Sequence, residues 1–117
     1  MNVLDMKKSV QDFCEARNWD QFHNPKDLAI GLVTEASELL EIFRFKSSKE
    51  CMEIMRDPSD LRQVQDELAD VTFLLLRFVQ LYQIDLEAAF YNKLEEIESK
   101  YPVEKFYGKN DKYKKEN

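Results

Sequence analysis

Apolar residues recur at helical spacing along nearly the whole chain. Between residues 3 and 17, the side chains of Val3, Met6, Val10 and Phe13 fall three or four positions apart, which predicts an amphipathic helix. Similar patterns, bounded by turn and capping residues, predict helices over residues 25–46, 48–56, 58–82 and 86–100. A mixed polar and aromatic stretch at residues 18–23 interrupts the spacing and predicts a loop. We therefore expect an all-α protein.

Capping residues mark where the predicted helices begin and end. Asn24 and Asp57 each precede a proline, so that a side-chain oxygen can cap free N–H groups while the proline occupies the first turn. Ser47 is followed three residues later by Glu50, which has the form of a capping box. Asp85 can cap the last helix. Pro102 ends it, because the residue before a proline disfavours helical geometry.

The number and length of these helices favour a particular architecture. Four principal helices joined by short connections favour a four-helix bundle, with the short helix at 48–56 as an extra element. The chain of 117 residues has the length of one domain, which we expect over residues 1–108, followed by a polar and flexible tail at 109–117. The segment 71–79 is apolar on nearly all sides, which favours self-association into an oligomer.

Composition and charge narrow the class of protein. The net charge of −6 argues against a nonspecific binder of nucleic acid or of anionic membranes, since both require a basic face. Cys14 and Cys51 show no metal-binding spacing and are expected to be free thiols of an intracellular protein. No signal segment opens the chain, and the longest apolar run, 71–76, is too short to cross a bilayer. We expect a cytoplasmic protein with neither nucleic acid nor membrane as a partner.

Two pairs of acidic residues stand out against these apolar helices. Glu35 and Glu38, with Glu41 one turn further, form an acidic stripe beside an apolar one, and Glu67 and Asp70 repeat the spacing on a second helix. Acids held beside a core repel one another and are stabilised by a cation. Oxygen ligands favour Mg²⁺, Mn²⁺ or Ca²⁺, and Mg²⁺ typically binds carboxylates together with substrate phosphates.

We therefore predict that Mg²⁺ binds to a site formed by Glu35, Glu38, Glu67 and Asp70, and that the protein acts on phosphates. The alternative is that each pair lies on an ordinary solvated helix face, where acids at this spacing are common. A ferritin-like di-iron site would require Glu-x-x-His pairs. The sole histidine, His23, does not follow a glutamate by three residues, so the sequence does not favour a di-iron site.

Several motifs together resemble one known family. They are the two acidic pairs, the stretch from Trp19 through Phe22 and His23 to Pro25, and the closing Lys100-Tyr101-Pro102. This combination resembles the MazG-like all-α nucleoside triphosphate pyrophosphohydrolases, and within them the dCTP pyrophosphatase branch. The resemblance implies Mg²⁺-dependent cleavage of a nucleoside triphosphate between its α and β phosphates, with Mn²⁺ as a possible substitute. It further implies a homo-oligomer, either a dimer or a tetramer, that cleans surplus or non-standard nucleotides from the pool.

If the protein is such a pyrophosphohydrolase, further residues are candidates for accepting a proton, for binding the phosphates and for binding the base. A carboxylate that the metal does not fully engage could accept a proton from the attacking water, with Glu38 as the first candidate and Glu41 as the second. The candidate cations for the phosphates are Lys46, Arg77, Lys93 and Lys100, and the family resemblance favours Lys93 and Lys100. Aromatic and histidine side chains can stack on a base or bind its edge. The candidates for this are Trp19, Phe22, His23 and Phe45, although Trp19 and Phe22 could equally plug the end of the bundle.

Three positions depart from the dCTP branch. Phe45 stands where that branch tends to have Trp, Leu74 replaces an aromatic residue, and Ile97 replaces an asparagine. These departures leave the acidic pairs intact and leave the base preference open. Two alternatives therefore stand beside a pyrimidine-directed enzyme. One is a purine-directed or broad-specificity pyrophosphohydrolase, and the other is a non-catalytic helical protein that uses the 71–79 surface to bind a partner.

Overall fold

The computed structural model describes residues 2–114, and this part of the chain contains helices and no strands. The elements are α1 (Val3–Ala16), the 3₁₀ helix η1 (Asp20–Phe22), α2 (Pro25–Phe43), α3 (Ser48–Arg56), α4 (Pro58–Leu81), α5 (Leu86–Lys100) and α6 (Val103–Phe106). The all-α prediction is confirmed. Across the described residues, the helices lack the combination of length and apolar character that a membrane span requires.

The predicted helix starts are confirmed at the level of single hydrogen bonds. The backbone N–H of Asp27 donates to the Asn24 side chain, and Ser47 and Glu50 form a reciprocal capping box. Asp57 and Asp85 cap α4 and α5 in the same manner. The α2 helix ends at Phe43 rather than at residue 46, because Arg44 leaves the helical backbone with ψ of 137° and Phe45 then adopts a left-handed backbone with φ of 64°.

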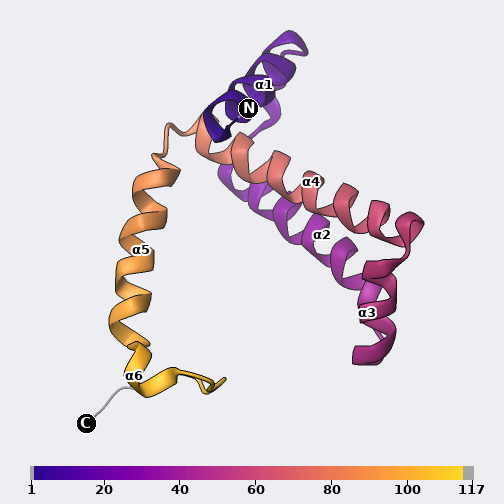
Figure 1. Ribbon diagram of the computed structural model, residues 1–117. Coiled ribbons are helices and arrows are strands. Elements are labelled where there is room, and N and C mark those ends of the chain that lie inside the picture. Colours follow the sequence, from indigo (N-terminus) through magenta and orange to yellow (C-terminus); the bar gives the residue numbers. More distant parts are fainter. Residues whose placement is uncertain (1, 115–117) are drawn as a thin grey trace. The chain divides into compact units, whose positions relative to one another are not determined.

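The chain divides into two compact units, one ending at Ile84 and the other beginning at Asp85. In the first unit, α2 and α4 lie side by side and antiparallel (Figure 1). Gly31 faces Leu74 at their contact, where a Cβ atom on residue 31 would lie 3.1 Å from Leu74 Cδ1. A side chain larger than hydrogen would press on Leu74 here, so the glycine lets the two helices approach closely.

A small core joins α1 to the second half of α4. Val10 and Cys14 of α1 pack against Leu76, and the partly buried Phe73 packs on this cluster. The ring of Phe13 meets the ring of Phe73 edge to face, with centroids 5.7 Å apart. Helix α3 packs against α4. Helices α1, α2 and α3 therefore all pack against α4, which is the central helix of this unit.

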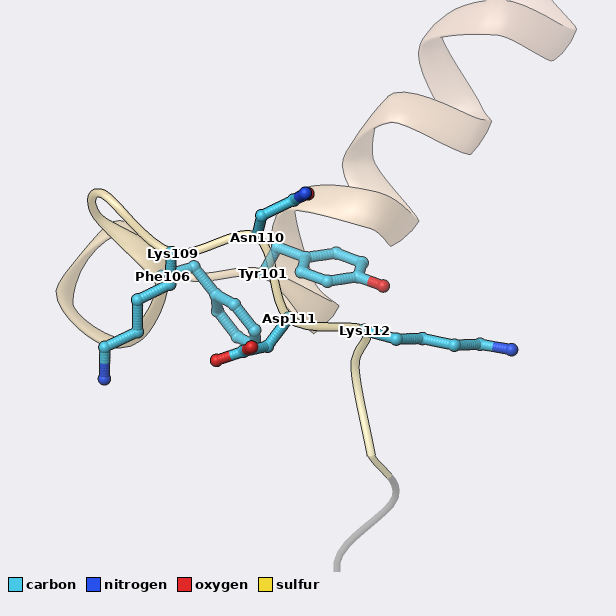
Figure 2. Close-up of a pocket in the computed structure, with 6 residues that line it drawn as sticks. All are labelled: Tyr101, Phe106, Lys109, Asn110, Asp111 and Lys112. Atoms are coloured by element: carbon cyan, nitrogen blue, oxygen red, sulfur yellow. The ribbon is translucent and has the colours of Figure 1, made fainter. Parts of the chain in front are cut away.

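The second unit consists of α5, α6 and the segment that follows them. The N–H of Tyr113 donates to the Tyr101 hydroxyl over 2.9 Å, and the rings of Tyr101 and Phe106 meet with centroids 4.8 Å apart. Figure 2 shows the shallow pocket that results, which is lined by Tyr101, Phe106, Lys109, Asn110, Asp111 and Lys112. The single domain over 1–108 and the flexible tail over 109–117 stay predictions, and residues 115–117 of that tail lie outside the described part.

The core predicts which leucines of α4 matter for stability. Leu76 is 4 % exposed, whereas its neighbour Leu75 is 38 % exposed. We expect Leu76→Ala to lower the free energy of unfolding by about 2–5 kcal/mol, because it removes buried methyl groups and leaves a cavity. Urea denaturation measures this, and Leu75→Ala is the matched control that should lose clearly less. Equal losses in both variants would contradict the packing described here.

Candidate metal centre

The two acidic pairs meet across the α2–α4 contact. Within each pair the spacing of three residues places the side chains one turn apart on the same helix face. Glu35 lies one turn beyond Gly31 on α2, and Asp70 lies one turn before Leu74 on α4. One carboxylate oxygen from each of Glu35, Glu38, Glu67 and Asp70 lies within 4.8 Å of the others. The structure thus brings these four side chains to one place.

Burial leaves part of this cluster without hydrogen-bonding partners. Glu38 and Asp70 are exposed, while Glu35 and Glu67 are half-buried. The Oε2 atoms of Glu35 and Glu67 are shielded from solvent and have no hydrogen-bond partner among the described residues. A buried carboxylate oxygen without a partner is destabilising, and coordination to a cation satisfies it. These two orphaned oxygens fit a bound divalent cation.

The electrostatics of the cluster also favour a bound cation. Burial raises the pKa of Glu35 and of Glu67, and the neighbouring Glu38 raises it further through its side-chain contact and its negative charge. Asp70 adds to the shift in both glutamates. The carboxylates therefore oppose one another's ionisation when no cation is bound, and a divalent cation would reverse that effect.

The hydroxyl groups close in sequence to the acids donate hydrogen bonds to backbone carbonyls. Thr34 and Ser37 donate to carbonyl oxygens of α2 over 2.8 and 2.6 Å, and Thr72 donates to the Leu68 carbonyl over 2.8 Å. These donors therefore do not satisfy the carboxylates. The potential ligands are carboxylate oxygens, which favours Mg²⁺, Mn²⁺ or Ca²⁺ over softer metals.

Glu41 lies apart from the cluster. Its carboxylate pairs with Arg44 over 2.9 Å, and both side chains are well exposed. Glu38 belongs to the four-carboxylate group, whereas Glu41 does not. The structure therefore separates the two residues that the sequence left as alternative proton acceptors, with only Glu38 at the cluster itself.

The C-terminal end of α2 carries an unusual aromatic residue. Phe45 is 91 % exposed, and its φ of 64° places a bulky residue in the left-handed region, which is strained. The Arg44 guanidinium lies 4.5 Å from the centre of its ring. Lys46 follows directly and is exposed. This ring is accessible for stacking.

The other predicted base-binding residues lie around η1. The Trp19 ring meets Phe13 edge to face with centroids 5.4 Å apart, and it lies 6.2 Å from the His23 ring. Phe22 is largely exposed. Trp19 thus packs partly on α1, as the plug interpretation expects, while it also borders His23. The part of these residues in binding a base stays a prediction.

Arg77 is buried and hydrogen-bonded within the protein, which differs from the role that the sequence suggested. It was a candidate cation for phosphates, but its side chain is fully buried and its guanidinium donates to His23, Gln80 and Asp20. These bonds occupy Arg77, so it is not a free phosphate ligand. The signal that could have identified this role is an arginine within an apolar run on the same α4 face as Asp70.

The two lysines favoured as phosphate ligands lie in the second unit. Lys93 and Lys100 both pair with Glu96, at 3.3 and 3.0 Å. Lys100 also lies 5.8 Å from the centre of the Tyr113 ring. The involvement of these lysines with phosphates stays a prediction.

Comparison with known proteins places this arrangement in context. The model of the MazG-like family matches residues 30–115. The dCTP pyrophosphatase 1 of Rattus norvegicus is 33 % identical over 109 residues, or 93 % of this chain, and that of Homo sapiens is 31 % identical over 99 residues, or 85 %. The chain spans 64 % and 58 % of the length of these two relatives. The crystal structure of a pyrophosphatase from Archaeoglobus fulgidus superimposes with a TM-score of 0.75 at 35 % identity, covering 81 % of this chain and 87 % of that one.

The repulsion within the cluster predicts a particular pH dependence of stability. A carboxyl group whose pKa is higher in the folded than in the unfolded state binds more protons when folded, so stability falls as the pH rises from the ordinary value of 4.5 through the raised one. We expect the metal-free protein to melt at a lower temperature at neutral pH than at about pH 5 for this reason. Glu35→Gln should raise the melting temperature at neutral pH and flatten the dependence.

Thermal melting in a chelating buffer across this pH range measures the effect. Glu53→Gln is the control, because it removes the same charge from an exposed position on α3 outside the cluster. A destabilised Glu35→Gln protein, or the same stabilisation in both variants, would contradict the electrostatic description.

Proposed function

Because the chain belongs to the MazG-like family, we propose that it is a nucleotide pyrophosphatase whose active site is the four-carboxylate cluster. The observation that carries this proposal is the convergence of Glu35, Glu38, Glu67 and Asp70, with two shielded oxygens that have no hydrogen-bond partner among the described residues. Such a set of oxygen donors suits Mg²⁺, with Mn²⁺ as a substitute. Relatives named dCTP pyrophosphatase and pyrophosphatase support the assignment.

The reaction we propose is hydrolysis of a nucleoside triphosphate between its α and β phosphates. Bound at the carboxylates, Mg²⁺ would offset the triphosphate charge and polarise the α-phosphoryl group. A water oxygen bonds to the α-phosphorus, the bond to the bridging oxygen breaks, and pyrophosphate leaves with that oxygen. Glu38 accepts the proton of the water, because it belongs to the cluster while its side chain is exposed. Glu41 is the less suitable base, since Arg44 pairs with it.

The substrate we propose is a pyrimidine deoxynucleoside triphosphate such as dCTP. The names of the relatives support this, and the exposed ring of Phe45 offers a stacking surface. Trp19, Phe22 and His23 would form the rest of the base site. Because the length of α2, about 28 Å, separates these residues from Phe45, the ring of Phe45 would come from a second copy in the homo-oligomer proposed below. Lys46, Lys93 and Lys100 would meet the phosphates. The activity would remove surplus or non-standard nucleotides, and two free cysteines agree with a cytoplasmic location.

We further propose that the four principal helices form a bundle within a homo-oligomer, either a dimer or a tetramer. Exposed apolar side chains support this on both central helices of the first unit, namely Val33, Leu40, Leu68 and Leu75. A bundle that leaves such residues in water gains stability when a second copy covers them, at roughly 25 cal/mol per Å² of apolar surface.

The central test is release of pyrophosphate from a panel of pyrimidine and purine triphosphates with Mg²⁺. We expect the wild-type protein to yield the monophosphate and pyrophosphate, with a pyrimidine deoxynucleotide as the best substrate. Glu38→Gln and Glu67→Gln should each lower the rate by about 100-fold or more, whereas Glu53→Gln should retain the rate. Loss of activity in Glu41→Gln but not in Glu38→Gln would reassign the base, and a preference for purines would reassign the substrate.

Metal binding is tested without any substrate. An ion that binds only the folded state stabilises it by about 2.7 kcal/mol at 100 times its dissociation constant. We expect Mg²⁺ to raise the melting temperature of the wild-type protein but not of Glu67→Gln, with Glu53→Gln again as control. A protein that neither responds to Mg²⁺ or Mn²⁺ nor cleaves any nucleotide would instead fit the non-catalytic helical interaction protein.

A further inference from the structure

A cluster of polar groups near the C-terminal end of α4 is built around one buried arginine. Arg77 is the one charged side chain found buried among the described residues. Its Nε donates to His23 Nδ1 over 2.7 Å, its Nη1 donates to Gln80 over 2.6 Å, and its Nη2 pairs with Asp20. Each nitrogen of the guanidinium thus has a separate acceptor, and Asp20 supplies the balancing charge.

The bond from Arg77 determines where the proton of His23 lies. A guanidinium group can only donate hydrogen bonds, so the Nδ1 atom that faces it must present a lone pair. A neutral imidazole with its lone pair on Nδ1 carries its proton on Nε2. The Tyr82 hydroxyl, also from the end of α4, donates to the His23 carbonyl over 3.2 Å and fixes the backbone of this residue.

The cluster lies on the same face of α4 as the carboxylates. Asp70 and Arg77 are seven residues apart, which returns to nearly the same side of a helix after about 10 Å along its axis. Leu74 lies between them on that face and packs on Gly31. His23 is therefore held toward the start of α2, on the side of the carboxylates where we place the base of a nucleotide whose phosphates would occupy the proposed metal centre.

We propose that Arg77 is a positioning residue that holds His23 as a neutral Nε2–H donor for an acceptor atom on the edge of the substrate's base. This inference rests on the proposed function. The chemistry selects a ring nitrogen or a carbonyl oxygen of the base as the partner, and it excludes an exocyclic amino group, which has only hydrogens to offer. Asp20 acts through Arg77, because it neutralises the buried guanidinium and helps to orient it.

The charge state of His23 fits this role. Burial lowers the pKa of His23, the charge of Arg77 lowers it further, and Asp20 partly opposes the shift. The charged or titratable groups that face the residue are Arg77 and Tyr82 from α4 and Asp20 from η1. A neutral histidine donates to a base without attracting the phosphates, so the phosphates are left to the metal centre.

The first test is a ¹⁵N NMR titration of His23 in the substrate-free and metal-free protein. His23 is the only histidine in the chain, so one set of ring signals reports both its tautomer and its pKa. We expect the Nε2–H tautomer and a depressed pKa in the wild-type protein. Arg77→Met should raise that pKa and admit the Nδ1–H tautomer, whereas Asp20→Ala should lower the pKa.

Controls separate this role from a merely structural one. Tyr82→Phe removes the bond to the His23 backbone but leaves the ring contact, so it should leave the tautomer unchanged. Asp20 is partly exposed, so Asp20→Ala carries the test if Arg77→Met does not fold. An Nδ1–H tautomer in the wild-type protein, or a rise of the His23 pKa in Tyr82→Phe equal to that in Arg77→Met, would overturn the proposal. An unchanged His23 pKa in Asp20→Ala would overturn it as well.

The second test is kinetic. We expect His23→Phe and Asp20→Ala to raise KM for the best nucleotide about 3- to 10-fold, the range of one hydrogen bond, with a smaller change in kcat. Arg77→Lys should partly rescue the loss seen in Arg77→Met. Unchanged KM values in His23→Phe and Asp20→Ala, alongside the expected NMR result, would overturn the base-reading role alone. No turnover of any nucleotide by the wild-type protein would overturn the proposed function and the base-reading role with it, while the NMR result would still describe the tautomer.

Discussion

The close antiparallel contact of α2 and α4 is the constraint on which the candidate site depends. Gly31 lets Leu74 of the opposite helix approach to a distance at which a Cβ atom would already be crowded. One turn away, this spacing brings carboxylate oxygens of both helices within 4.8 Å of one another. A wider separation would leave two independent acidic pairs in water, with no shared place for a cation.

The same contact lowers the folding stability of the protein when no ion is bound. Burial and mutual repulsion raise the pKa of Glu35 and Glu67, and each glutamate keeps one shielded oxygen without a hydrogen-bond partner among the described residues. The residues that would bind a cation therefore lower the folding stability of the metal-free protein, as is common at functional sites. Under the proposed function, cation binding would therefore be coupled to folding stability through these four side chains.

Two clusters along the α2–α4 pair differ in how their charges are balanced. At the carboxylates, midway along α4, like charges lie close together, and an external cation would balance them. Near the start of α2, a fully buried guanidinium is neutralised internally by Asp20 and is satisfied by His23 and Gln80. Asp70 and Arg77 lie on one face of α4, so under the proposed function the carboxylates would meet the charged part of a ligand and the Arg77 cluster its uncharged part.

Much of this protein follows from its sequence. Helices α1 to α5 and the caps of α2 to α5 were predictable, because capping bonds join residues only three positions apart and apolar spacing reports the buried face directly. The short helix η1, in the stretch expected to be a loop, and the short helix α6 were not predicted. The acidic pairs were visible for the same reason. Their convergence could be inferred only as a hypothesis, since periodicity gives the face of each helix and not its partner.

Other features depend on contacts between distant parts of the chain. The bond from Arg77 to His23 joins residues 54 positions apart, so the apolar run around Arg77 can suggest that it is buried, but no local pattern identifies the partners that occupy it. Helix α2 also ends before its sequence pattern does, because Arg44, which precedes the left-handed Phe45, has a ψ of 137°. The sequence alone determined the helices and the chemical character of their faces, because these follow from short-range spacing. Only the tertiary structure decided which charged groups are neutralised internally, because that depends on which helix faces meet.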